Sequence, residues 1–324
     1  MSAWYRGRRV LVVGGMGFIG STLTRQLVDA GAGVTVLTRS LDAHRELAAQ
    51  LSAEGVRLEQ GDVRDAAAMA RVVAGQNVVF NLSGQSGAAR SVEDPHTDLD
   101  INYRGHLVVL EAARQVSPDA KVVFASSRLH YGHQDSLPVP EDATPDPRSF
   151  HAIHKSAAED ATRVYGRLFG LRAVVARITN PYGPGQPRER TAYGVINRLV
   201  HLAVSGEPLT IYGAGSQLRD YVHVSDVAAA LMVMGESPAA DGRTYNVGSG
   251  TGTPLVAAAR AIVEIAGGGR IEHVPWPPLA EQVETGDFVA DISRITSELG
   301  WMPSMALRQG LEQTVAAYQE GERR

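Results

Sequence analysis

A short apolar run that passes directly into glycines is the feature that most constrains this chain. Residues 10–13 are all valine or leucine, as in a buried strand, and Gly14, Gly15, Gly17 and Gly20 follow them. A helical pattern begins inside the glycine run. A strand that turns on glycine into a helix aims several backbone N–H groups and the positive helix end at one point. We therefore expect this turn to bind a diphosphate group.

The sequence around this turn supports the same interpretation. A second β-branched run at 33–37 follows a helix stop at Gly31. A glycine pattern alone is a weak signal, but a strand before it and a helix after it are the context that a dinucleotide loop requires. A tight turn without a ligand is the alternative. The residues expected to form the loop are Gly14, Gly17, Phe18, Ile19 and Gly20.

The first half of the chain repeats this alternation of strand and helix. Strands are expected at 9–13, 33–37, 56–58, 77–82, 121–125 and 172–178, and helices at 18–30, 41–53, 65–74, 98–117 and 150–169. This order predicts an α/β fold with a Rossmann-type, doubly wound parallel sheet and right-handed crossovers. Ligands bind at the carboxyl ends of such strands. The residues that fall at those ends are Thr38, Arg39, Asp62, Val63, Leu82, Ser83, Gly84, Ser126 and Ser127.

After about residue 180 the pattern changes to a proline- and glycine-rich loop and then to helices near 191–205, 225–235, 253–266, 291–299 and 305–320. We expect a dinucleotide-binding domain over 1–179, to which segments near 220–248 return. Residues 180–324 are expected to form mainly a smaller C-terminal, substrate-binding lobe. The cleft between the two is the expected ligand site.

Composition excludes several classes of protein. The 324 residues contain no cysteine, so disulfides, thiolate metal sites and cysteine nucleophiles are excluded. The pairs His130 with His133 and His151 with His154 have a spacing that can hold a metal, but no acidic partner stands beside them, so no metal is expected. The net charge of -4 gives no reason to expect nucleic acid or an anionic membrane as a partner. No apolar run approaches the roughly 18 residues that span a bilayer. The N-terminal residues lead directly into the first strand, which favours a cytoplasmic protein without a signal peptide.

Seven motifs then occur in order along nearly the whole chain. They are GGMGFIG at 14–20, GDVRD at 61–65, FASSRLHYG at 124–132, NPYGP at 180–184, RDYVHVSDV at 219–227, YNVGSG at 245–250 and GWMP at 300–303. Together they resemble the extended short-chain dehydrogenase/reductase family, the NAD-dependent nucleotide-sugar epimerases and dehydratases. The resemblance implies an enzyme that acts on a nucleoside-diphosphate sugar and keeps its nicotinamide cofactor.

The resemblance favours an epimerase that works through a transient keto sugar. A keto-sugar reductase or dehydratase and a non-catalytic nucleotide-sugar or dinucleotide-binding protein are the alternatives. The family's 4,6-dehydratases carry an acidic pair where this chain has Arg128 and Leu129. Neither side chain supplies the protons that water elimination requires, so ordinary 4,6-dehydration is disfavoured.

The resemblance also implies the catalytic residues. The family uses a tyrosine base with a lysine four residues later, and here Lys155 is present but His151 stands at the tyrosine position. A neutral imidazole can accept a proton near pH 7. The alternative is that His151 merely starts a helix in a site without redox activity. Ser127 matches the hydroxyl that orients the sugar, while Tyr131 and His154 are expected to pack elsewhere.

Further roles follow from the resemblance alone. The family's NAD-binding members carry an aspartate where this chain has Thr38. The next residue, Arg39, suits the extra phosphate of NADP. We therefore expect the cofactor to be NAD or NADP, with Arg39 favouring NADP. The cofactor-binding set is completed by Lys155 and Thr179. The substrate-binding residues are expected to be Gln85, Ser86, Arg90, Ser127, Asn180 and Arg219, with Arg188, Arg190 or Arg198 replacing a second diphosphate arginine that is missing before Gly286.

Relatives of this kind dimerise through two long helices, which correspond here to 98–117 and 150–169. The resemblance therefore predicts a homodimer. The apolar residues expected on the first helix of that interface are Leu107, Val108, Leu110 and Ala113.

Overall fold

A seven-stranded parallel sheet forms the centre of the protein, for which a computed structural model describes residues 3–186 and 194–322. Its strand order is β10-β6-β5-β4-β1-β2-β3, and every neighbouring pair is parallel. The strands are β1 (Arg9–Val13), β2 (Gly33–Thr38), β3 (Arg57–Gln60), β4 (Val78–Asn81), β5 (Lys121–Ser127), β6 (Ala173–Ile178) and β10 (Thr244–Val247). The predicted Rossmann-type, doubly wound α/β fold is confirmed.

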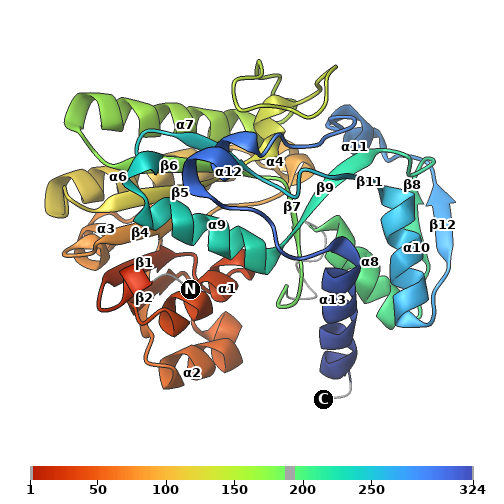
Figure 1. The fold of residues 1–324 in the computed structure, drawn as a ribbon, viewed down its shortest axis with the longest axis horizontal. Helices are drawn as coiled ribbons and strands as arrows, with labels where there is room; N and C mark the ends of the chain where they lie inside the picture. Colours follow the sequence, from red (N-terminus) through yellow and green to blue (C-terminus); the bar gives the residue numbers. More distant parts are fainter. Residues whose placement is uncertain (1–2, 187–193, 323–324) are drawn as a thin grey trace.

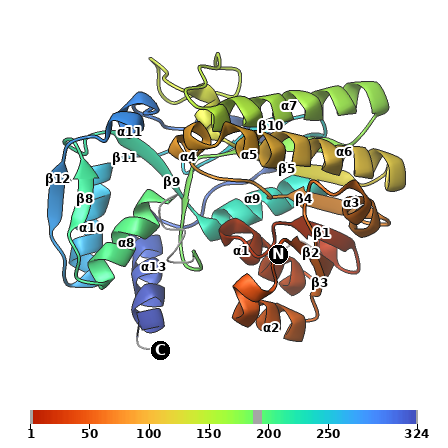
Figure 2. The same ribbon diagram turned by 180° about the vertical axis from the view of Figure 1, so that it is seen from behind.

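Helices cover both faces of this sheet (Figures 1 and 2). One face carries α3 (Ala66–Val73), α6 (Gly105–Val116) and α7 (Phe150–Phe169), and the other carries α1 (Phe18–Asp29) and α9 (Val224–Glu236). Successive strand residues point to opposite faces. Val10 and Val12 accordingly join the core under α1 and α9, while Leu11 and Val13 join the core under α3 and α6. Burial on both sides explains why the first strand is apolar throughout.

The switch in strand order falls between β1 and β4, because β2 lies on one side of β1 and β4 on the other. The crevice at such a point is where doubly wound sheets bind ligands. The other helices outside the C-terminal unit are α2 (Arg45–Ala53), α4 (Ala88–Glu93), α5 (Pro95–Leu99) and α12 (Ser293–Leu299). Short 3-10 turns lie at Ala3–Tyr5, Asp42–His44, Arg128–Tyr131 and Pro238–Ala240.

The segment expected as one helix over 98–117 is divided. Helix α5 ends at Leu99, a π-helical turn spans Asp100–Arg104, and α6 continues to Val116. Such π turns are frequent at functional sites. Here the turn brings the side chain of Asn102 against the backbone of Gln85, with which it exchanges two hydrogen bonds of 3.2 and 2.9 Å.

The C-terminal part builds a smaller unit beside the sheet. It contains β7 (Asn180–Tyr182), β8 (Leu209–Tyr212), β9 (Leu218–His223), β11 (Gly252–Pro254), β12 (Ile271–Val274), α8 (Val195–Val204), α10 (Leu255–Ala266), α11 (Pro278–Gln282) and α13 (Leu307–Glu322). Leu199, Leu209, Ile262 and Leu311 share its apolar core. Helix α9 and strand β10 join the main sheet instead. The expected domain boundaries stay a prediction.

In the described residues, no helix combines the length and the apolar character needed to cross a membrane. The cytoplasmic location and the expected lack of nucleic-acid and membrane partners stay predictions.

Two residues expected at a dimer interface lie elsewhere. Leu110 and Ala113 are completely buried, because α6 turns them toward the sheet, where they pack with residues of β1 and β4. They cannot contact a second chain, so this part of the prediction is wrong. Leu107 and Val108 are only half-buried, and Leu107 lines a shallow groove between α6 and α7.

Candidate active site

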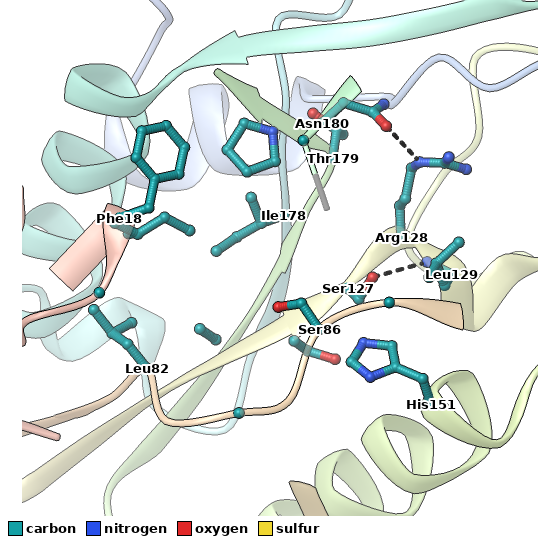
Figure 3. A pocket seen from close by; sticks show the side chains of 18 of the residues that line it. Phe18, Leu82, Ser86, Ser127, Arg128, Leu129, His151, Ile178, Thr179 and Asn180 are labelled. Carbon is teal, nitrogen blue, oxygen red and sulfur yellow. Dashed lines mark hydrogen bonds between the residues drawn. The ribbon is translucent and has the colours of Figure 1, made fainter. Parts of the chain in front are cut away.

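A cavity of about 420 Å³ opens at the carboxyl ends of β1, β4, β5 and β6. This volume lies in the range of small-molecule sites. Phe18 and Leu82 lie toward one end of the view in Figure 3, and His151, Ser127 and Arg128 lie toward the other. The cavity therefore has an apolar end beside the glycine loop and a polar end beside α7.

The glycine loop has the shape that a diphosphate requires. Gly14 has a φ of 83°, and a Cβ atom on Gly20 would collide with the carbonyl oxygen of Gly14. Helix α1 starts directly after Gly17, and within the described chain no side chain caps its first N–H groups. These donors and the helix dipole are thus free for an anion. The loop fits the diphosphate of a dinucleotide.

His151 lies in the first turn of α7, where the Ser149 hydroxyl caps the helix by accepting from the N–H of Ala152. Its Nδ1 is 3.4 Å from Oδ2 of Asp98 and 3.3 Å from Nδ2 of Asn102. Asp98 is completely buried on α5. These contacts hold the imidazole at the wall of the cavity, which it lines.

The charge of Asp98 decides which ring nitrogen of His151 carries the proton. Burial raises the pKa of Asp98, but hydrogen bonds from His151 and His154 outweigh burial and lower that pKa overall. An ionised carboxylate only accepts and Nδ2 of Asn102 only donates, so these two neighbours favour opposite tautomers of His151. The negative charge of Asp98 makes its hydrogen bond the stronger one and favours a proton on Nδ1. The other oxygen of Asp98 is 2.7 Å from Nδ1 of His154. With Nδ1 protonated, Nε2 of His151 keeps its lone pair and can act as a base.

Ser127 and Lys155 line the same cavity as His151. Ser127 ends β5, and its Oγ accepts from the N–H of Leu129 at 3.2 Å, which leaves its proton available to a ligand. Lys155 donates from Nζ to the carbonyl oxygen of Ala125 at 2.9 Å. Burial lowers the pKa of Lys155 to about 8, although Asp98 and Glu159 oppose the shift. The structure thus brings the three expected catalytic residues together.

Most of the other expected site residues also line this cavity, and some do not. Those in the lining are Gly14, Gly17, Phe18, Ile19, Gly20, Leu82, Ser83, Gly84, Gln85, Ser86, Thr179 and Asn180. Those outside it are Thr38, Arg39, Asp62, Val63, Arg90 and Arg219, while Arg188 and Arg190 lie outside the described residues. Arg198 donates to Thr210.

Arg219 is engaged by the chain itself. Its Nη2 is 2.5 Å from Oε1 of Glu284, and its Nη1 donates to the carbonyl oxygens of Leu218 and Gly286. The carboxylate of Glu284 thus pairs with Arg219, the residue that the resemblance assigns to a diphosphate of the substrate.

Asp98 and Asn102 contact His151, and neither is among the site residues expected from the sequence. A signal for them existed: Asp98, Asn102 and His106 recur every four residues, which places three polar side chains on one helical face. All three are buried. Within the described ranges, Asp98 and the two histidines that it contacts do not form a set able to hold a metal ion.

Tyr131 lies away from the cavity lining. It is completely buried, donates to Oδ1 of Asn246 at 2.7 Å and accepts from Arg177. Burial raises the pKa of its phenol, although Arg177 opposes the shift. Tyr131 therefore cannot replace His151 as a base.

Comparison with known proteins places these features in a family context. A family model described as the NAD dependent epimerase/dehydratase family matches residues 10–248. A UDP-glucose 4-epimerase of Mycolicibacterium smegmatis is 32% identical over 312 residues, which cover 95% of this chain and 97% of that protein. A dTDP-glucose 4,6-dehydratase of Streptomyces griseus is 31% identical over 319 residues, or 95% and 93% of the two chains. The UDP-glucose 4-epimerase of Thermus thermophilus, solved in complex with NAD, has a TM-score of 0.86 at 32% identity and covers 96% of this chain and 99% of its own.

Proposed function

The chain belongs to the NAD dependent epimerase/dehydratase family, and on this premise we propose that it is an NAD(P)-dependent nucleoside-diphosphate-sugar epimerase. The reaction proceeds through a transient keto sugar. The observation that carries the proposal is His151, which faces the cavity of the glycine loop with Asp98 behind it and Ser127 and Lys155 beside it. Relatives named as nucleotide-sugar 4-epimerases support the same reaction class.

Each catalytic side chain has a defined task in this reaction. The Ser127 hydroxyl orients the sugar hydroxyl, and Nε2 of His151 removes its proton while Asp98 stabilises the imidazolium that forms. A nicotinamide cofactor, which the glycine loop and Lys155 would hold, would supply a reversible hydride acceptor for this step. His151 gives the proton back after the keto sugar has turned its other face to the cofactor. Lys155 supplies a positive charge to the cavity beside Gly84.

A dehydratase and a reductase are the nearest rivals within the family. Arg128 and Leu129 occupy the end of β5 where elimination would need an acid and a base, which disfavours the dehydratase. A reductase would use the same His151 and Ser127 but would consume its cofactor in each turnover. Cofactor stoichiometry therefore separates the epimerase from the reductase.

The test combines cofactor identification with a substrate assay. The purified protein is denatured and any released dinucleotide is identified by mass spectrometry, and the native protein is incubated with UDP-glucose, UDP-N-acetylglucosamine and dTDP-glucose under NMR observation. We expect released NAD or NADP and the epimer of one sugar, without added cofactor. Turnover that depends on added NADPH would favour the reductase. No bound dinucleotide and no product would favour a binding protein.

The same mass spectrum decides between NAD and NADP. We propose that Arg39, which is exposed directly after β2, contacts the extra phosphate of NADP. Thr38 offers no carboxylate for the ribose hydroxyls that an NAD-specific site would bind. Released NAD without NADP would contradict this role of Arg39.

Turnover is expected to decline at high pH because Lys155 loses its charge. With a pKa of about 8, the amine is protonated at neutral pH and becomes neutral as the pH rises through that value. We expect kcat/KM to fall about tenfold for each pH unit above pH 8. Lys155→Arg keeps a positive charge throughout this range, so its decline should begin at a higher pH. A decline at the same pH in both proteins would assign it to another group.

We further propose that the chain forms a homodimer through the face of α6 and α7. The shallow groove on this face is lined by Tyr103, Leu107, Val164 and Tyr165, among others. Val164 is an exposed apolar residue, and an apolar groove of this kind favours burial against a second copy. We expect sedimentation at micromolar concentration to show a dimer and Val164→Arg to shift it toward the monomer. A monomeric wild-type protein would refute this interface.

A further inference from the structure

The cavity described above has an excess of positive charge. Its described lining contains Arg128, Lys155 and His151 but no aspartate or glutamate. Lys155 already donates to the backbone carbonyl of Ala125 and lies beside Gly84. Arg128 lies at the end of the cavity away from Phe18 and Leu82 (Figure 3).

Arg128 is a buried cation without a carboxylate within ion-pair distance in the described chain. Only 8% of the residue is exposed. Its Nε donates to Oδ1 of Asn180 at 3.4 Å and its Nη1 donates to Oγ1 of Thr285 at 3.0 Å, and both acceptors are neutral. Its Nη2 makes no hydrogen bond to any residue of 3–186 or 194–322. The guanidinium lies 5.2 Å from the ring centroid of Phe288.

Two other buried arginines, unlike Arg128, form ion pairs with carboxylates. Arg177 donates to both carboxylate oxygens of Glu159, and Arg219 pairs with Glu284. Burial, together with the nearby charge of Arg219, lowers the pKa of Arg128 to about 9. Arg128 is still protonated at neutral pH, but its charge is poorly compensated. A buried charge is costly unless an anion pairs with it.

Tyr221 provides a second, independent indication. Its side chain lines the same cavity and is 4% exposed, and its hydroxyl has no hydrogen-bond partner among the described residues. Tyr221 and Arg128 lie close enough to interact electrostatically. A buried hydroxyl without a partner is rare in native proteins. Two donors in one cavity, Nη2 of Arg128 and the Tyr221 hydroxyl, thus lack an acceptor among the described residues.

We propose that Arg128 and Tyr221 form an oxyanion subsite that binds a negatively charged group of the substrate. This inference rests on the proposed nucleotide-sugar function and names the part of the substrate that the subsite holds. Arg128 directly follows Ser127 in the chain, and both residues line the cavity. A carboxylate on the sugar is one source of the anion. The diphosphate is the other, because Glu284 already neutralises Arg219.

The experiment measures ligand binding to the cofactor-loaded protein by calorimetry and does not depend on turnover. UDP, UDP-glucose and UDP-glucuronic acid are titrated into the wild-type protein and into Arg128→Gln. The last two ligands differ only in the group on the sugar, which is neutral in one and a carboxylate in the other. Arg308→Gln is the matched control, because it removes an exposed arginine that pairs with Glu264 in the C-terminal unit.

We expect Arg128→Gln to weaken binding about 10- to 100-fold, as for a lost charge-assisted hydrogen bond. A loss confined to UDP-glucuronic acid identifies a sugar carboxylate, and an equal loss for all three ligands identifies the diphosphate. Unchanged affinity for every ligand overturns the subsite. If the wild-type protein binds none of the three and the substrate assay described above gives no product, the proposed function fails first and the subsite with it.

Tyr221→Phe keeps the experiment decisive if Arg128→Gln does not fold. This variant removes only the hydroxyl, and we expect about a 3- to 10-fold loss of affinity for the same ligands that Arg128 recognises. Arg308→Gln should bind every ligand as the wild-type protein does. A Tyr221→Phe variant with wild-type affinities would overturn the role of Tyr221.

Discussion

Replacing His151 with alanine is expected to lower kcat by about 100- to 10,000-fold, the usual contribution of a positioned general base. The imidazole lines the cavity with Asp98 on its Nδ1 side, and it is the group best placed to take the sugar proton. Tyr131 is completely buried outside the cavity lining and cannot take over. The measurement is the rate of epimer formation by protein that retains its dinucleotide.

Two controls separate catalysis from damage to the fold. His96→Ala makes the same chemical change at an exposed position on α5 and should keep the wild-type rate. Free imidazole added to His151→Ala should restore part of the activity, because the truncated side chain leaves room for it beside Asp98. An unchanged rate in His151→Ala would show that this residue is not the base.

His151→Tyr examines the alternative that the site lacks redox activity. The variant introduces the phenol that the family carries at this position, four residues before Lys155. If His151 is a working base, the histidine protein is active and the tyrosine variant is at best comparable. An inert wild-type protein that becomes active in His151→Tyr would instead identify a family member without its catalytic base.

The central fold was predictable because its strands are buried on both faces. Residues 10–13 are apolar throughout, and β1 occupies 9–13 as predicted. The helix starts were predictable where a cap or a glycine marks them, as at Ser149 before α7. Strand β10 carries no comparable local signal, since only its pairing with β6 places it in the main sheet.

The finer arrangement of the site depends on tertiary contacts that spacing does not reveal. The π-helical turn at Asp100–Arg104 divides a helix that periodicity predicts as continuous, and it brings Asn102 to the loop after β4. The pairing of Arg219 with Glu284 joins residues 65 positions apart. The motif that contains Arg219 gives no sign of this carboxylate.

Asp98→Asn is expected to lower kcat about 100-fold with little change in thermal stability. The substitution keeps the shape of the buried side chain but removes the negative charge that fixes the proton on Nδ1 of His151. The new amide can donate to Nδ1, and Asn102 can as well, which moves the proton to Nε2 and leaves no lone pair facing the substrate. Asp94→Asn, at the exposed cap of α5, makes the same change four residues away and should keep the wild-type rate.

A double variant tests whether Asp98 acts through His151 or by itself. If its task is to position the imidazole, Asp98→Asn should cost almost nothing further in a protein that already carries His151→Ala, because the group it orients is gone. His154 still contacts Asp98 in the His151→Ala variant. Any stability that Asp98→Asn loses through this contact is therefore lost equally with and without His151→Ala. A further 100-fold loss in the double variant would contradict the positioning role and would mean that the carboxylate acts on the substrate without the histidine.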